Sequence, residues 1–245
     1  MCLIVFAWKL IPNLPLIAAA NRDEFYERPS APAAAWLEHP QVFAGRDLKA
    51  GGSWMGIAHD AVAGARFAAI TNIRGPQERR TDAPSRGALV TDYLAGTMTA
   101  QEYVAKLEAV SDLYNGFNLV LGDRDTLIWF SNRGQHDARN GKALAPGIYG
   151  LSNALLDAAW PKILKTKAQF ASLLCQGAPD EAYFDMLADT TRAPDNRLPE
   201  TGVSLELERL LSAVRIESPG YGTRTSSIVK LYAEGAATLH EVLIR

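Results

Sequence analysis

The sequence predicts an α+β sandwich in which helices cover antiparallel sheets. Apolar runs typical of strands occur near both ends of the chain, whereas helix-like periodicity is grouped in its middle. The turns between the strand-like runs are short, which favours antiparallel neighbours because parallel strands need longer crossovers. With 245 residues, 48% of them hydrophobic, the chain can bury a sizeable core. We therefore expect a single domain over residues 1–245.

The first two dozen residues predict a buried β-hairpin. Apolar runs at residues 3–8 and 15–20 flank a Pro/Asn turn at 11–13. The second run ends in Asn21-Arg22-Asp23-Glu24, and Cys2 begins the first. The hairpin thus places a thiol, an amide and several charges at one end.

The next elements are expected to be mostly strands. Residues 28–35 resemble a loop, because two prolines disrupt regular pairing. A glycine-punctuated strand region covers 42–47 and 50–57, and a further strand ends at Asn72. The pair Gly51-Gly52 either lets the backbone approach a ligand closely or forms a tight turn.

The middle of the chain predicts helices and a second hairpin. Ser85 and Thr99 are the expected N-caps of the first two helices. The expected elements in order are helices over 87–94 and from 99 to about 110, strands at 117–121, 127–130 and 149–153, helices over 161–177, 179–188 and 203–213, and strands at 221–232 and 237–244. The polar stretch 189–201 is a long loop, either a lid or a mobile excursion.

Composition narrows the functional class. The net charge of -2 and the dispersed basic residues argue against nucleic acid as a partner. No apolar run reaches the ~20 residues of a membrane span, and two cysteines do not make a disulfide framework. Neither a metal-ligand cluster nor a nucleotide-binding fingerprint is present. We expect a cytoplasmic protein that takes a small-molecule ligand or substrate and needs no metal; the oligomeric state is not readable from the sequence.

Several apolar runs end in asparagine, at Asn21, Asn72 and Asn153. Asparagine favours strand ends for backbone reasons, which is one interpretation. The other is that these amides join Arg224 and Cys2 in a site.

Cys2 is the candidate nucleophile of such a site. A thiol reacts as thiolate and needs a base. Removal of Met1 would leave an α-amine with a pKa of ~7.7–8.0 that can take the proton. Asn72 or Asn153 could donate to the developing oxyanion, and Arg224 could hold the amine and thiolate or bind a substrate carboxylate. The alternative is that Cys2 is a small hydrophobic residue on a buried strand.

The motifs together resemble the NRDE family, that of the transport and Golgi organisation protein 2 homologues. The resemblance covers almost the whole chain and rests on Met1-Cys2, Asn21-Arg22-Asp23-Glu24, Gly45-Arg46-Asp47, Gly51-Gly52-Ser53-Trp54-Met55-Gly56, Thr71-Asn72-Ile73-Arg74, Tyr149-Gly150-Leu151-Ser152-Asn153 and Gly222-Thr223-Arg224-Thr225-Ser226-Ser227. It implies a four-layer αββα sandwich of N-terminal-nucleophile hydrolase type, and links with haem trafficking and with lipid or coenzyme A metabolism.

More distantly, the pattern is similar to the choloylglycine hydrolase and penicillin V acylase group, which cleaves amides with an N-terminal cysteine. This likeness implies Cys2 as nucleophile, with Asn72, Asn153 and Arg224 as the other catalytic positions. The group carries Arg-x-x-Asp where this chain has Asn21 and Glu24. Arg22 is not expected to replace that arginine, because adjacent side chains of a strand point to opposite faces.

Three hypotheses follow. The first is hydrolysis of a non-peptide C–N bond by Cys2, with Glu24 helping to orient the site. The second is a non-catalytic protein that binds haem, lipid or acyl-CoA, with His39, His59, His136 or Cys2 as the iron ligand; the third is a scaffold without a small ligand. The expected substrate-binding residues are Asn21, Arg22, Asp23, Arg46, Trp54 and Arg74.

Overall fold

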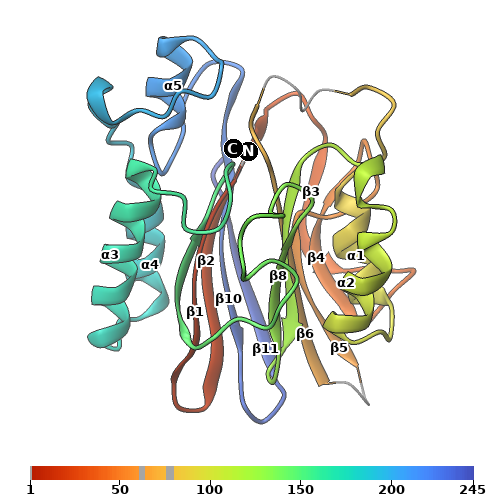
Figure 1. Cartoon of the computed structure of the whole chain (residues 1–245). Coiled ribbons are helices and arrows are strands. Elements are labelled where there is room, and N and C mark those ends of the chain that lie inside the picture. Colours follow the sequence, from red (N-terminus) through yellow and green to blue (C-terminus); the bar gives the residue numbers. More distant parts are fainter. Residues whose placement is uncertain (1, 61–63, 76–79) are drawn as a thin grey trace.

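Two antiparallel sheets stack between two layers of helices (Figure 1), which confirms the α+β sandwich. The computed structural model describes residues 2–60, 64–75 and 80–245. The five-stranded sheet contains, in spatial order, β11 (Ala237–Leu243), β10 (Tyr221–Leu231), β2 (Leu14–Phe25), β1 (Cys2–Ile11) and β9 (Gly147–Leu151). The six-stranded sheet contains β3 (Ser30–Ala35), β4 (Val42–Asp47), β5 (Met55–Asp60), β6 (Gly64–Asn72), β7 (Phe117–Asp123) and β8 (Leu127–Ser131).

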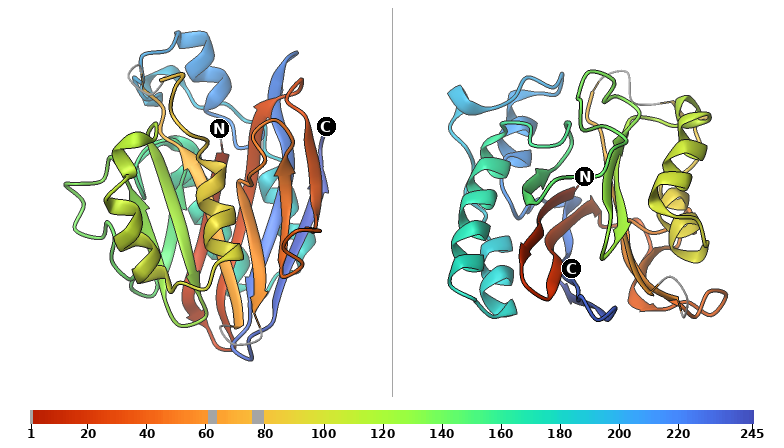
Figure 2. Two further views of the ribbon diagram at one scale, coloured as in Figure 1. Left: turned by 90° about the vertical axis from the view of Figure 1, so that its right-hand side faces the viewer. Right: turned by 60° about the horizontal axis from the view of Figure 1, so that its bottom comes forward.

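The helices form the two outer layers (Figures 1 and 2). Those on the six-stranded sheet are α1 (Gly87–Ala95) and α2 (Ala100–Glu108), followed by the 3₁₀ turn η1 (Ser111–Leu113). Those on the side of the five-stranded sheet are α3 (Pro161–Cys175), α4 (Asp180–Leu187) and α5 (Leu205–Leu211), with the 3₁₀ turn η2 (Asp195–Arg197) before α5. Among the helices of the described residues, none combines the length and apolar character that a membrane crossing requires.

The first hairpin is confirmed, and its second strand is longer than expected. Asn13 turns the chain with a φ of 63°. The polar residues 21–24 continue β2 to Phe25 because that strand pairs with β1 on one side and β10 on the other. Pairing with β1 reaches Arg22, and pairing with β10 carries the strand on to Phe25.

Two local predictions were wrong. Residues 30–35 form β3 despite Pro32, because β3 is the edge of its sheet, where a proline is tolerated. Arg86, not Ser85, is the cap of α1, and no side chain caps that helix. The expected cap Thr99 is confirmed, since it forms a capping box at the start of α2.

The glycine pair combines a turn with a close backbone contact. Gly51 has a φ of 82° and donates to Asp47 at 2.7 Å, which closes a tight turn. A Cβ on Gly52 would lie 2.4 Å from the carbonyl carbon of Gly87. The close approach is thus to the start of α1.

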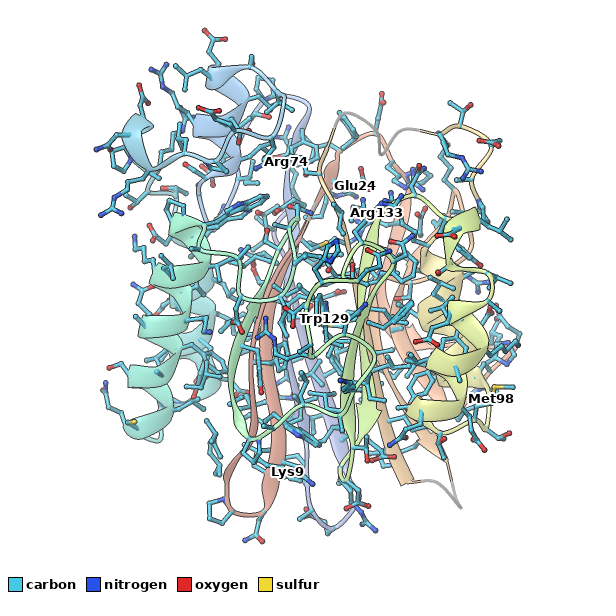
Figure 3. The ribbon with its side chains drawn as sticks, in the orientation of Figure 1. Lys9, Glu24, Arg74, Met98, Trp129 and Arg133 are labelled. Atoms are coloured by element: carbon cyan, nitrogen blue, oxygen red, sulfur yellow. The ribbon has the colours of Figure 1, made fainter. Side chains whose placement is uncertain are left out.

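The main core lies between the sheets, and two further cores lie under the helices. Alternation along β1 sends Ile4 into the inter-sheet core and Leu3 towards α3 and α4. Trp129, fully buried, marks the middle of the inter-sheet core (Figure 3). The same alternation decides which polar residues can face each other at the end of the sandwich.

The loop 189–201 packs against α5. Arg209 forms an ion pair with Asp195 at 2.6 Å, and the Thr201 amide donates to Glu208 at 2.9 Å. These contacts tie the loop to its neighbour in the chain.

Candidate functional site

A cavity of about 550 Å³ lies between the two sheets, at the end where β1 begins. Its lining includes Cys2, Arg22, Asp23, Glu24, Arg28, Arg46, Asp47, Lys49, Ser53, Trp54, Asn72, Arg86, Thr225 and Glu241. Both sheets contribute, so the sandwich brings together residues from near the start of the chain and near its end. No residue of the loop 189–201 lines this cavity, and the lid interpretation finds no support.

Cys2 faces the cavity directly opposite Arg22. The register of β1 and β2 pairs Cys2 with Arg22, and both line the cavity. Opposite residues of an antiparallel pair share a face, and the same face continues into Ile4 and Ala20 of the inter-sheet core. The expectation that Arg22 points away from the thiol was therefore wrong: the register puts a cation beside it.

Cys2 is 8% exposed, and its surroundings include groups that raise the pKa of its thiol and groups that lower it. Burial raises the pKa of the thiol, and the Asp23 carboxylate raises it further. The Arg22 guanidinium and the backbone N–H of Asp23 lower the same pKa, since both favour the thiolate. The site therefore holds the groups that stabilise a thiolate within a desolvated environment that opposes it.

Asn72 and Asn153 meet at the cavity edge, but only Asn72 lines it. The Asn153 side-chain amide donates to the carbonyl oxygen of Asn72 at 2.8 Å. Ser152 donates to the carbonyl oxygen of Cys2 at 2.9 Å and to the side chain of Asn153 at 3.2 Å. Ser152 and Asn153 thus connect the start of β1 with the end of β6, and Asn153 positions Asn72.

The structure does not bring Arg224 to the thiol. Arg224 is the extra residue of a β-bulge in β10, between the pairs that Thr223 and Thr225 make with β2. Its guanidinium donates to the carbonyl oxygens of Phe25 and Arg28, at 3.1 and 2.9 Å, and to that of Arg245. It is not among the residues that line the cavity.

The other residues of the polar run 21–24 separate by face. Asn21 donates to the carbonyl oxygens of Leu187 and Val214, each at 2.9 Å, so it faces the helices. Asp23 contributes to the cavity lining, and its carboxylate accepts a hydrogen bond from the Thr223 hydroxyl at 2.6 Å. Glu24 lines the cavity, with its carboxylate 3.9 Å from the Arg28 guanidinium.

Of the other predicted binding residues, Arg46 and Trp54 line the cavity, whereas Arg74 does not. Arg46 forms an ion pair with Glu38 and stacks on Trp36 at 4.3 Å. Arg74 pairs with Glu208 of α5 at 3.1 Å, and Figure 3 shows it beneath that helix, at the same end of the molecule as Glu24.

Several polar residues at this end were not predicted. Arg28 pairs with Asp47 at 2.7 Å, and Glu241 accepts from the Ala33 amide at 2.8 Å, joining β11 to β3. Burial raises the pKa of Glu241. Lys49, Arg86 and Thr225 are among the other unpredicted polar residues that line the cavity. A run of polar residues could have indicated Arg28, but Glu241 carries no local signal because only the stacking of the sheets brings it here.

None of His39, His59 and His136 lines the cavity. In the part of the chain that the structure describes, no group of three or more His, Cys, Asp or Glu side chains could hold a metal ion. Cys2 is thus the only residue of the proposed iron ligands at this cavity.

The fold and the cavity define an α+β sandwich protein with a cysteine pocket between its sheets. The chain belongs to the Transport and Golgi organisation 2 family, whose family model matches residues 1–245. It is 36% identical to the Transport and Golgi organization protein 2 homologs of Bos taurus and Homo sapiens, over 98% of this chain and 92% of each relative. The Transport and Golgi organization protein 2 of Drosophila melanogaster is 30% identical, over 96% of this chain and 89% of the relative. The family expected from the motifs is confirmed.

Proposed function

We propose that the protein hydrolyses a non-peptide C–N bond with Cys2 as the nucleophile. The observation that carries the proposal is the register that places Arg22 opposite Cys2 in a cavity of about 550 Å³. A cation beside a thiol favours the thiolate, the form that attacks a carbonyl carbon.

In the proposed reaction, the α-amine of Cys2, freed by removal of Met1, takes the thiol proton. Met1 itself lies outside the described residues. The thiolate sulfur attacks the amide carbon, and the Asn72 side chain donates to the developing oxyanion. The C–N bond then breaks, the amine leaves with the proton held by the base, and water hydrolyses the thioester.

The first experiment combines intact mass with a hydrolysis assay. The protein is expressed without a tag at its N-terminus, and its mass is compared with those of the chain with and without Met1. A panel of N-acyl amides is then screened for release of the amine by mass spectrometry. Loss of Met1 and turnover that disappears in Cys2→Ala are expected.

Cys175→Ala is the matched control, because Cys175 is a free and exposed cysteine on α3. It is expected to leave turnover unchanged. Met1 retained in the processed protein, or turnover that survives in Cys2→Ala, would rule out the reaction.

The proposal also places the protein in the cytoplasm, where a thiol stays reduced, and cell fractionation tests that location.

A second candidate is non-catalytic binding of haem or of a lipid such as an acyl-CoA. Burial raises the pKa of the Cys2 thiol, which favours a thiol that is protonated at neutral pH. Arg22, Lys49 and Arg86 line the cavity and suit the acidic groups of such ligands. Titration with haem and with palmitoyl-CoA tests this candidate: no Soret shift and no heat of binding would remove it, and binding without hydrolysis would favour it over the first.

A further inference from the structure

One amide side chain that the proposed reaction does not use is buried between the two sheets. Asn118 lies on β7 and is fully buried. The register pairs it with Thr71 of β6 and Ser131 of β8, and the same inward face continues into Val120 of the inter-sheet core. A buried carboxamide is costly unless it is hydrogen-bonded, so its partners indicate what it does there.

Both the nitrogen and the oxygen of the Asn118 amide have partners. The nitrogen donates to the Thr71 hydroxyl at 3.1 Å and to the carbonyl oxygen of Ala154 at 2.9 Å. The oxygen accepts from the indole N–H of Trp129 at 3.2 Å, and Figure 3 shows Trp129 between the sheets. The side chain therefore bonds to three separate segments of the chain.

Two of these partners are chain neighbours of the asparagines of the site. Thr71 precedes Asn72, the last residue of β6, and Ala154 follows Asn153 shortly after β9. The strands β6 and β9 belong to different sheets. The buried amide thus links the two sheets at the site. The two linked segments, called here the inter-sheet junction, are residues 71–74 and 152–154.

Further hydrogen bonds connect the inter-sheet junction internally and to the nucleophile. The Arg74 backbone N–H donates to the carbonyl oxygen of Asn153 at 2.8 Å, and the Asn153 amide donates to that of Asn72, also at 2.8 Å. The Ser152 hydroxyl donates to the carbonyl oxygen of Cys2 at 2.9 Å. The spacing between Cys2 and Asn72 therefore depends on this junction.

We propose that Asn118 is a positioning residue that holds the inter-sheet junction closed and so fixes Asn72 relative to Cys2. An oxyanion donor is effective only within hydrogen-bond distance of the developing charge, so a small movement of Asn72 costs rate. The inference rests on the proposed roles of Cys2 and Asn72 in hydrolysis. It assigns Asn118 no contact with substrate, and Asn118 is not among the residues that line the cavity.

The first measurement needs no substrate. Amide hydrogen exchange is followed by NMR in the wild type and in Asn118→Leu, which is similar in size but has no hydrogen-bonding group. The reporter is the Arg74 amide, because its hydrogen bond to Asn153 crosses the junction. We expect this amide to exchange at least about tenfold faster in Asn118→Leu, because losing buried hydrogen bonds lowers the free energy of local opening.

Asn132→Leu is the matched control. Asn132 is also buried, accepts from the Phe117 N–H at 3.0 Å and donates to the carbonyl oxygen of Ser111 at 2.9 Å. Neither partner belongs to the inter-sheet junction. Asn132→Leu is expected to speed exchange of the Phe117 amide and to leave that of Arg74 within about threefold of the wild type.

The second measurement uses a substrate from the hydrolysis screen. Asn118→Leu is expected to lower kcat at least about tenfold and to leave KM within about threefold, because the oxyanion donor acts in the transition state. A change in KM alone would overturn the proposal. If the wild type hydrolyses nothing, the proposed reaction fails, and the exchange measurement still decides the role of Asn118 in the junction.

An unchanged exchange rate of the Arg74 amide in Asn118→Leu would overturn the proposal. The same holds if Asn132→Leu speeds that amide equally, which would indicate a merely structural role for Asn118. If Asn118→Leu does not fold, Thr71→Val decides, because it removes one of the two acceptors of the Asn118 nitrogen. Equal exchange rates of the Arg74 amide in Thr71→Val and the wild type would then overturn the proposal.

Discussion

Replacing Arg74 by methionine leaves the Glu208 carboxylate buried without its counter-ion. The two side chains are 9% and 5% exposed and lie 3.1 Å apart, so at an effective dielectric of ~20 their attraction is about 5 kcal/mol. Desolvation of both ions offsets much of that attraction, but removing one partner leaves the whole desolvation cost of the other. We expect Arg74→Met to lower the free energy of unfolding by about 3–5 kcal/mol, measured by urea denaturation at pH 7.

A double-mutant cycle makes this prediction specific. In the wild type, the Thr201 backbone N–H donates a hydrogen bond to the Glu208 carboxylate at 2.9 Å. Glu208→Gln removes the charge and keeps a side-chain oxygen that can accept this hydrogen bond. The double variant Arg74→Met/Glu208→Gln should recover at least about 2 kcal/mol relative to the sum of the single effects. Arg209→Met on the same helix, with its side chain 41% exposed, is the control and should cost below about 1 kcal/mol. Additive effects in the cycle, or an Arg74→Met cost below about 1 kcal/mol, would refute the reasoning.

Three further predictions concern stability. Gly52→Ala should lower the free energy of unfolding by more than about 2 kcal/mol, because its Cβ would lie 2.4 Å from the backbone of Gly87. Gly51→Ala should lower it by about 1–2 kcal/mol, because Gly51 has a φ of 82° but open space around it. Equal melting temperatures of the two variants would contradict this prediction. Thr99→Ala should cost about 1 kcal/mol through loss of the capping box at α2, and an unchanged melting temperature would show that this cap contributes nothing. Burial lowers the pKa of Lys162 from 10.5 to about 8, so the unfolded chain binds more protons than the folded chain between these pH values. As the pH rises through that range, the free energy of unfolding of the wild type should increase by about 3 kcal/mol relative to that of Lys162→Met. A difference between the two proteins that does not change with pH would contradict the burial of the charge.

Strand register explains why the predicted site was right in some positions and wrong in others. Cys2, Glu24, Arg46, Trp54 and Asn72 line one cavity, as expected for residues at one end of the sandwich. Counting residues along the strand nevertheless misplaced the face of Arg22, because the face shared with Cys2 depends on how β1 and β2 pair.

The bulge in β10 is a second feature that sequence spacing could not reveal. One extra residue in that strand lets Thr223 and Thr225 pair with consecutive residues of β2 and leaves Arg224 outside the pairing. Arg224 therefore binds main-chain carbonyls beside Phe25 instead of facing the thiol. Lys162 had no local signal at all, because its burial depends on how α3 packs against the sheet.

By itself, the sequence determined the features whose causes are local. Alternating and helical periodicity, the turn at Asn13 and the cap at Thr99 depend on residues close in the chain, and the structure confirms each of them. Only the tertiary structure decided the pairing of Cys2 with Arg22, the strand at 30–35 and the burial of Lys162. These depend on register, on edge position and on the packing of a helix against a sheet, which are relations between distant segments.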